Sequence, residues 1–237
     1  SGGVWRAAPV HAREEGGGDL SADAAWRPAD SNCTLDIAVR GDPTRVLPFM
    51  PGAVRHIVSW MTFGADPVAF TGRVSGVLGA DASWTVDSRI SGAGFTFRGV
   101  PLSSFSSGLA YSGRVVTLRG MRAARPEGEL TGDLAIDTHR EFYVLDLDST
   151  ADPNAIAKLI GPGFQRLISM ARFEGPTHIR AKGRVDGDDS RLTDVRLEVS
   201  GERLGVFWIV ADRASAAIDV AGQGAVFHDI QADVFGG

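Results

Sequence analysis

Apolar and polar residues alternate along most of the chain, so that every second side chain has the same character. In the segment 33–40, for example, Leu35 and Ile37 share one side and Asp36 lies on the other. A period of two is typical of β-strands with one apolar face, and antiparallel sheets with one face in water show it most clearly. The same alternation covers the segments 68–75, 84–90, 129–137, 178–185 and 194–199. The sequence therefore predicts a mainly β protein built on an antiparallel sheet.

Two interruptions of the alternation carry the signals of helix starts. Asp42 and Asp152 stand where an N-cap is expected, and Pro43 and Pro153 follow at the first helical position. A proline is favourable there because its missing N–H would have no partner within the helix. We expect a short helix after each of these prolines.

A second, amphipathic helix is expected in each half of the chain, after Pro51 and after Pro162. Its apolar residues recur at i, i+3, i+4 and i+7, which places them in one stripe along a helix. The stripe residues are Val54, Ile57, Val58 and Met61 in the first half, and Phe164, Leu167, Ile168 and Ala171 in the second. Each helix must therefore bury one face against the sheet, a partner or a membrane surface.

The sequence repeats itself at an offset of 110 residues. Segment 35–37, Leu-Asp-Ile, recurs at 145–147 as Leu-Asp-Leu, and segment 72–76, Gly-Arg-Val-Ser-Gly, recurs at 183–187 as Gly-Arg-Val-Asp-Gly after a slip to 111. Near the end, Met121 and Ala123 match Ile230 and Ala232 at a shift of 109. The constant order predicts tandem units: the end of a preceding repeat over 1–30, a full unit over 31–140, and a truncated second unit over 141–237.

The apolar face of such a sheet needs a cover. Several strands side by side expose more apolar area than the few hundred Å² that a protein in water normally tolerates. A second sheet, the amphipathic helices or bound acyl chains could supply the cover, and one short helix per unit is too small to do so alone. We expect the sheet to be folded over, with an interior that is either dry or filled with lipid. The residues expected to line this interior are Leu130, Leu134, Ile136, Leu145, Leu147, Val195, Leu197 and Val199.

Composition and charge narrow the class of protein. The chain has 237 residues, a hydrophobic fraction of 43% and a net charge of −5, so a globular protein is expected and nucleic-acid binding is disfavoured. Its single cysteine excludes an intrachain disulfide framework. The 30 glycines show no collagen period and indicate many tight turns. No apolar run approaches the roughly 18 residues that span a bilayer.

Catalytic and metal-binding patterns are weak. The histidines His11, His56, His139, His178 and His228 are scattered, form no HExxH pair and do not recur at the repeat offset. The acidic segment 186–190 does not have the spacing of an EF-hand and is interpreted as a hairpin turn. The sequence therefore predicts no enzyme, no cofactor and no metal site.

A spaced motif of apolar residues and glycines marks the end of each repeat. Its first copy consists of Val116, Leu118, Met121, Ala123, Gly128, Leu130 and Gly132. The second copy of the motif runs from Val226 through Ile230 to the final two glycines. Together with the tandem alternating strands, this motif resembles the repeat ends of the AsmA-like superfamily, which includes the TamB-type envelope proteins. The resemblance extends over nearly the whole chain.

The resemblance implies a fold, a location and a function. It implies an extended antiparallel sheet curled into a groove, or taco-like shape. The short proline-initiated helices expected in each repeat depart from this pattern, and they would either plug the groove or cap a closed sandwich. It implies a Gram-negative envelope protein in the periplasm, held in the inner membrane by a segment outside this chain. Phospholipid or another acyl lipid would bind or move along the apolar groove, in lipid transport and membrane biogenesis, with envelope proteins as further partners.

A different function fits the same residues. A closed sheet with a dry core would be a non-catalytic scaffold that spaces or docks envelope components, and the amphipathic stripe at Val54–Met61 would then be a partner surface. A glycan-processing enzyme fits less well, because no pair of acids clusters or recurs convincingly. Asp36 and Asp146 do recur, but on the polar strand face, where a solvated charge is the ordinary explanation.

Overall fold

The chain is mainly β, as the alternation predicts. The structure, a computed structural model, describes residues 3–7, 9–13, 18–42, 44, 55, 58–64, 68–137, 139–140, 142–161, 164–165, 168–169, 171–206, 209–222 and 224–234. Two units make up the chain: unit 1 is Ser1–Gly120 and unit 2 is Met121–Gly237. The division between them falls inside one strand, β9 (Val115–Arg125).

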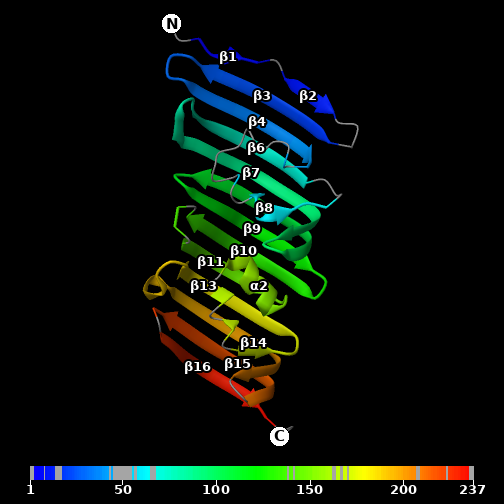
Figure 1. Cartoon of the computed structure of the whole chain (residues 1–237), viewed down its shortest axis with the longest axis vertical. Coiled ribbons are helices and arrows are strands. Elements are labelled where there is room, and N and C mark those ends of the chain that lie inside the picture. The colour runs from blue at the N-terminus through cyan, green and yellow to red at the C-terminus, as the bar shows by residue number, and fades with distance from the viewer. Residues whose placement is uncertain are drawn as a thin grey trace. The chain divides into compact units, whose positions relative to one another are not determined.

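Unit 1 is an antiparallel sheet (Figure 1). Its strands are β1 (Trp5–Arg6), β2 (Val10–Arg13), β3 (Asp19–Arg27), β4 (Asn32–Gly41), β5 (Met61–Thr62), β6 (Val68–Val77), β7 (Ala80–Phe97) and β8 (Val100–Ser112), followed by β9. The hydrogen-bonded order is β1-β3-β4-β6-β7-β8, with β2 also on β3 and β5 on β7. β3 falls in the segment that the sequence assigned to the end of a preceding repeat, yet it pairs along its length with β4.

Among its described residues, unit 2 has the same kind of sheet together with the α-helix α2. Its elements are β10 (Gly128–Asp137), β11 (Phe142–Ser149), α2 (Pro153–Ile160), β12 (Ala171–Phe173), β13 (Thr177–Asp186), a 3-10 turn at Ser190–Leu192, β14 (Asp194–Val206), β15 (Ile209–Ala221) and β16 (Gly224–Asp233). The order is β10-β11-β13-β14-β15-β16, with β12 on β14.

The pairing of strands recurs from one unit to the other. In unit 1 the short strand β5 pairs with the end of β7, and in unit 2 the short strand β12 pairs with the end of β14. The pair Val86–Tyr111 in β7 and β8 has its counterpart in Val195–Val220 of β14 and β15, at an offset of 109. The internal repeat seen in the sequence is therefore also a repeat of strand connectivity.

The register of one repeated segment differs from the alignment of its letters. Gly72 pairs with Ile37, and the counterpart of Ile37, Leu147, pairs with Ala181. Gly72 thus corresponds to Ala181 rather than to Gly183, so that the offset here is 109 and not 111. A shift of two residues keeps every side chain on its face, since side chains alternate with a period of two.

The last strand of each repeat, β9 and β16, has a residue with a positive φ in its interior. Gly120 in β9 has φ +56°, and Asp229, its counterpart in β16 at offset 109, has φ +51°. In β16 the pairing with β15 shifts register here, between Ser215 and Ala217, which is the mark of a β-bulge. Glycine takes this conformation freely, and aspartate is among the few other residues that tolerate it.

The helix predicted after Asp152 is present. The Asp152 side chain accepts a hydrogen bond from the N–H of Asn154 at 3.0 Å, and Pro153 is the first helical residue of α2. In unit 1 the Asp42 side chain likewise accepts from the N–H of Thr44 at 2.9 Å, but Pro43 and residues 45–54 lie outside the described residues. The predicted amphipathic helix does not reach Met61, which belongs to β5 and pairs with Phe97.

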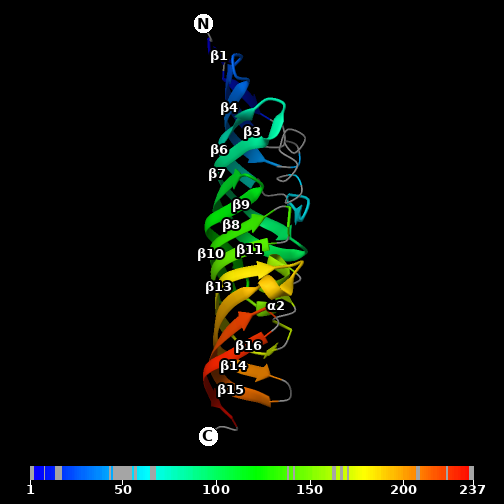
Figure 2. The same ribbon diagram turned by 90° about the vertical axis from the view of Figure 1, so that its left-hand side faces the viewer.

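The core of unit 2 lies between the sheet and α2. Figure 2 shows α2 on one side of the unit 2 strands, and six of its eight residues are buried. The opposite side of the sheet carries exposed charged residues, His178, Arg180, Lys182 and Arg184 on β13 alone. The helix therefore covers the apolar face, which includes Tyr143, Leu145 and Leu147 of β11.

The polar face is crossed by ion pairs between neighbouring strands. In unit 1, Arg73 of β6 donates two hydrogen bonds to the Asp36 carboxylate of β4, at 2.7 and 2.9 Å. These bonds lower the pKa of Asp36 from its usual value. In unit 2, Lys182 donates to Asp146 at 2.6 Å. Asp36 and Asp146, the two acids that recur in the sequence, thus have the same cross-strand role.

We expect Leu145→Ala to lower the free energy of unfolding by about 2–5 kcal/mol, because it leaves a cavity beneath α2. Leu145 is 2% exposed, whereas its neighbour Val144 is 48% exposed on the other face of the same strand. Val144→Ala should therefore change stability by no more than about 0.5 kcal/mol. Chemical denaturation of the two variants measures the difference, and equal losses would contradict a covered face in unit 2.

Removing the Arg73 guanidinium should return the pKa of Asp36 toward its usual value. A carboxylate with a depressed pKa in the folded state adds stability above its unfolded pKa, and that stability is lost as the pH falls through the folded pKa. Arg73→Gln should therefore raise the pKa of Asp36, and Arg73→Lys should raise it less, since a lysine keeps the charge but not the two-pronged bond. Titration of the Asp36 carboxyl carbon by NMR measures this. Arg180→Gln in unit 2 is the control, and an unchanged Asp36 in Arg73→Gln would refute the assignment.

Candidate functional site

The residues predicted to line an apolar interior do share one face of unit 2. Leu134 pairs with Leu145, and Val195 lies across from Gly183, which in turn lies across from Leu145. Seven of the eight are between 1% and 8% exposed, and Val199 is half-buried. The structure thus brings these residues together but leaves them little contact with solvent.

The covering residues come from α2 and from the segment that follows it. Ile156, Leu159 and Ile160 of α2 are buried, and so are Phe164 and Ile168 of the predicted amphipathic stripe. Leu167 lies outside the described residues, as do Val54 and Ile57 of the first stripe, while Val58 is half-buried. In unit 2 the stripe therefore packs inward, as part of the core.

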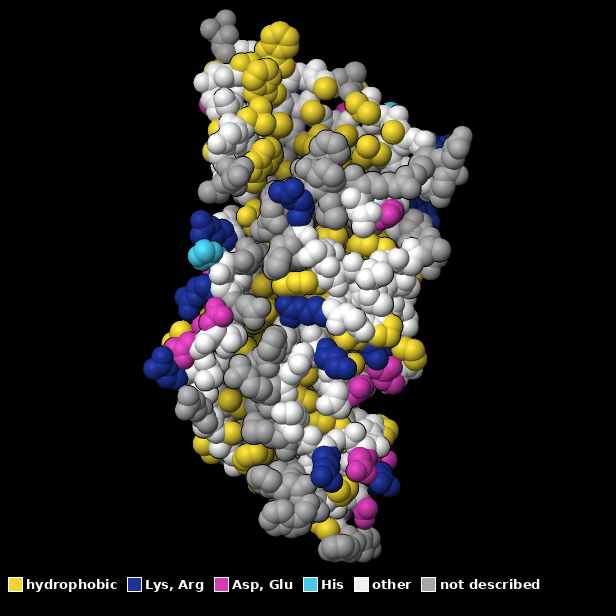
Figure 3. Space-filling view, in the orientation of Figure 1, with side chains coloured by type: hydrophobic (Ala, Val, Ile, Leu, Met, Phe, Trp, Pro, Cys, Tyr) yellow, Lys and Arg dark blue, Asp and Glu magenta, His cyan; other side chains and the backbone are white. Residues whose placement is uncertain are grey.

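The equivalent face of unit 1 is more open. On β4, Cys33, Leu35, Ile37 and Val39 are all half-buried, and so are Leu20, Ala22 and Ala24 on β3. At the end of β3, Trp26 is 42% exposed, whereas its counterpart in unit 2, Ile136, is 6% exposed. Figure 3 shows hydrophobic side chains gathered over the strands of unit 1 that lie nearest the N-terminus. The same strand positions are thus covered in unit 2 and partly accessible in unit 1.

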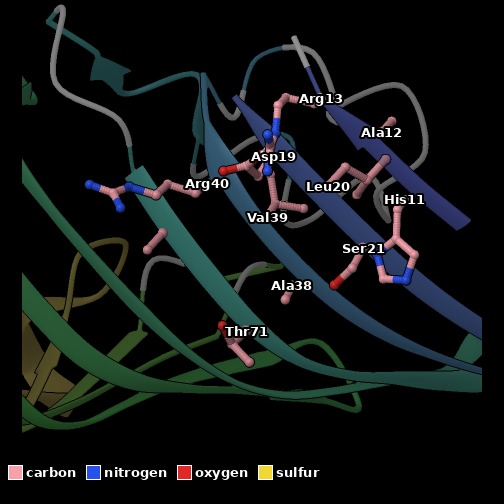
Figure 4. Close-up of a pocket in the computed structure, with 11 residues that line it drawn as sticks. His11, Ala12, Arg13, Asp19, Leu20, Ser21, Ala38, Val39, Arg40 and Thr71 are labelled. Atoms are coloured by element: carbon pink, nitrogen blue, oxygen red, sulfur yellow. Dashed lines mark hydrogen bonds and ion pairs between the residues drawn. The ribbon is translucent and has the colours of Figure 1, made fainter. Parts of the chain in front are cut away.

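A hollow of about 700 Å³ lies against the strands of unit 1 that are nearest the N-terminus (Figure 4). It is formed by β2, β3, β4 and β6, and most of its lining residues lie on the polar face of the sheet, among them His11, Ser21, Ala38, Arg40 and Thr71. Arg13, which also lines it, pairs with Asp19 at 3.0 Å. Arg40 and His11 have no ion-pair partner among the residues that the structure describes, and in Figure 4 the Arg40 side chain runs away from Arg13 and Asp19. The hollow therefore belongs to the face opposite Leu35 and is separate from the apolar surface.

Two of the histidines singled out in the sequence pair with carboxylates. His178 lies 2.9 Å from Asp148, and His228 lies 3.0 Å from Asp219, both on the polar face. The other three histidines include His56, which lies outside the described residues. Within the described ranges, no group of three or more His, Cys, Asp or Glu residues is placed to hold a metal ion. Cys33, the single thiol, is half-buried.

The acidic turn after β13 is built around Asp186. This carboxylate is buried, accepts the backbone N–H groups of Asp188 and Asp189 at 3.0 and 2.8 Å, and receives Arg140 at 3.1 Å. A carboxylate satisfied by three donors of its own chain organises a turn. This fits the interpretation of the segment as a hairpin turn.

Sequence reasoning missed the open face of unit 1. Segment 18–30 was assigned to the end of a preceding repeat, so Leu20 and Trp26 were not considered for the site. The signal was present, because residues 20, 22, 24 and 26 are all apolar and alternate with polar or small residues. No local pattern, however, indicates that the apolar face is buried in unit 2 and partly accessible in unit 1.

Comparison with known proteins leaves the family open. Among the described residues, no helix has the length and the apolar character needed to cross a bilayer. No protein-family model, no curated protein and no solved structure was found to match the chain.

Proposed function

We propose that this chain binds acyl lipid on the apolar face of unit 1 and belongs to a lipid-transfer system of the cell envelope. The observation that carries the proposal is the difference in burial between equivalent positions. Leu20, Leu35 and Trp26 stay partly accessible where their counterparts in unit 2 are buried. An accessible apolar face on a sheet whose other face is charged is the surface that an acyl chain would cover.

The energetics favour a long, uniform ligand. Each methylene group that leaves water for an apolar surface contributes about 0.8 kcal/mol, so an acyl chain gains affinity in proportion to its length. β3 and β4, with nine and ten residues, are each roughly 30 Å long at about 3.3 Å per residue. Because the face presents aliphatic and aromatic groups without a directional polar contact, a chain on it can slide instead of being held at one point.

The hollow lined by Arg40, Ala38 and Thr71 does not extend this apolar face. Those residues share the polar face with the Asp36–Arg73 pair, so the hollow is no headgroup site for a lipid on the other side of the sheet. The proposal concerns the apolar face alone, and it needs no catalytic residue, no cofactor and no metal.

The resemblance to AsmA-like proteins supplies the cellular setting of the proposal. Members of that superfamily act in the envelope of Gram-negative bacteria, and a periplasmic location with other envelope proteins as partners follows from it. The repeated strand connectivity of the two units is the feature of this chain that agrees best with such a role.

A scaffold with a dry core is the second candidate, and unit 2 favours it. There the apolar residues of β10 and β11, such as Leu134 and Leu145, are buried together with α2, Phe164 and Ile168, so that they offer a lipid little surface. If unit 1 is covered in the same way in its working state, the chain would space or dock other proteins instead of binding lipid.

A matched pair of aspartate substitutions on β4 distinguishes the two functions. Leu35 and Thr34 are neighbours, both half-buried, and they point to the apolar and the polar face. Leu35→Asp should weaken binding of a fluorescent phospholipid by at least about tenfold, because a carboxylate would sit against the acyl chain. Thr34→Asp should bind within about twofold of the unsubstituted chain. Titration with nitrobenzoxadiazole-labelled phosphatidylglycerol measures both affinities.

Two further measurements make the experiment decisive. Circular dichroism and thermal unfolding establish that both variants are folded, and Trp26→Ser repeats the test at an exposed position where folding is less affected. Mass spectrometry of an organic extract reports lipid that co-purifies with the chain. Absence of lipid uptake by the unsubstituted chain, or equal uptake by the Leu35 and Thr34 variants, would refute the proposal and favour the scaffold.

A further inference from the structure

Two arginines on the polar face of unit 1 lie on either side of a glycine. Arg89 of β7 lies across from Gly108 of β8. Arg119 of β9 lies on the other side of Gly108, with its Cβ 3.7 Å from the place where a Cβ of residue 108 would stand. Neighbouring strands are about 4.8 Å apart, so the Cα atoms of the two arginines are separated by about 10 Å. Both arginines are exposed, and residue 108 places no side chain between them.

Neither of these guanidinium groups is paired with an acid. Arg73, on the same face, gives two hydrogen bonds to a carboxylate of β4. Arg89 and Arg119 form no ion pair and no side-chain hydrogen bond with any residue that the structure describes. The nearest acid along β7 is Asp87, which lies across from Arg73 in the adjacent row of the sheet. Two positive charges thus lie close together without an acid between them.

The internal repeat shows that the same row is charge-balanced in unit 2. There Arg180 lies across from Asp148 on one side and from Glu198 on the other. His228, the counterpart of Arg119, lies 3.0 Å from an aspartate of β15. The counterparts of these three acids in unit 1, at offsets of 110, 109 and 109, are Ala38, Arg89 and Ala110. The row in unit 1 therefore carries cations where unit 2 has both signs of charge.

The surroundings of Arg89 leave it open to a ligand from solvent. On the side away from β8, its row continues through Thr71, Ala38 and Ser21. These side chains are small, and the surface over them is hollowed, as Figure 4 shows. Strands β6, β7 and β8 are each paired on both sides, so the two arginines flank an interior strand and not the edge of a sheet.

We propose that Arg89 and Arg119 form a binding site for a phosphate monoester above Gly108. A guanidinium group can form two parallel hydrogen bonds to a phosphate, and such charge-assisted bonds are about twice as strong as neutral ones. A phosphate monoester carries a charge of about −1.5 to −2 at pH 7, which matches two guanidinium groups better than the single charge of a carboxylate does. The site lies on the face opposite Leu35, so it does not rest on the lipid binding proposed for the apolar face.

Titration of the full 237-residue chain with inorganic phosphate at pH 7 tests the site. The Nε–Hε NMR signals of the arginines report the binding. We expect saturable shifts at Arg89 and Arg119 with a dissociation constant of about 1 mM, and no shift at Arg180, which lies between two acids. Arg89→Gln and Arg119→Gln should each weaken binding by at least about tenfold, because each removes one of the two charges that the phosphate needs.

A substitution of Gly108 distinguishes one shared site from two separate charges. Gly108→Leu keeps both arginines but fills the space between them, so it should also weaken phosphate binding by at least about tenfold. The fold should tolerate it, since a Cβ at this position would have its nearest contact at 3.5 Å. Arg180→Gln is the control that removes one arginine from the same row of unit 2, and its affinity should stay within about twofold. Thermal unfolding establishes that each variant is folded.

Vesicles of phosphatidylcholine with and without phosphatidic acid identify the source of the phosphate group. Sedimentation that requires phosphatidic acid and is lost in Arg89→Gln would assign a lipid phosphate, and binding of inorganic phosphate alone would assign a soluble ester; both results support the site. A chain that takes up no fluorescent phospholipid but shows the shifts at Arg89 and Arg119 would refute the lipid proposal and leave this one standing. No saturable shift up to about 20 mM phosphate, an equal shift at Arg180, or unchanged affinity in Gly108→Leu would each overturn the proposal.

Discussion

Antiparallel backbone pairing is the constraint on which the rest of the structure depends. Each strand satisfies its N–H and C=O groups through its neighbours, and the ladder fixes alternate side chains on opposite faces. Charged residues such as Asp36 and Arg73 are thereby held together on one face, and apolar residues such as Leu35 are held on the other. The ladder therefore decides which side chains share the apolar face, and what packs over that face decides which of them are buried.

Equivalent positions of the two units are buried to different extents, and side-chain size alone does not explain the difference. Unit 2 has Leu134 and Tyr143 where unit 1 has the smaller Ala24 and Cys33, an offset of 110 in both cases. At another pair the order of size is reversed, since the larger Trp26 is exposed where Ile136 is buried. In unit 2 the residues buried with this face include Ile156 of α2, Phe164 and Ile168. Burial of an equivalent position therefore depends on what packs over the strand as well as on the residue itself.

The sequence predicted what depends on local patterns and missed what depends on distant partners. Alternation identified the strands, and the Asp152-Pro153 pair identified the start of α2, because both signals act within a few residues. Met61 was expected in a helix but is held in a strand by Phe97, and no local pattern contains that pairing. The sequence match aligned Gly72 of β6 with Gly183 of β13, two residues beyond the position that the strand pairing gives. Such a slip is not visible in the alternation, because it leaves every side chain on the same face. The site was only partly predictable, because α2 follows β11 closely in the sequence, yet no local pattern shows which apolar residues are buried with it in unit 2 and which stay accessible in unit 1.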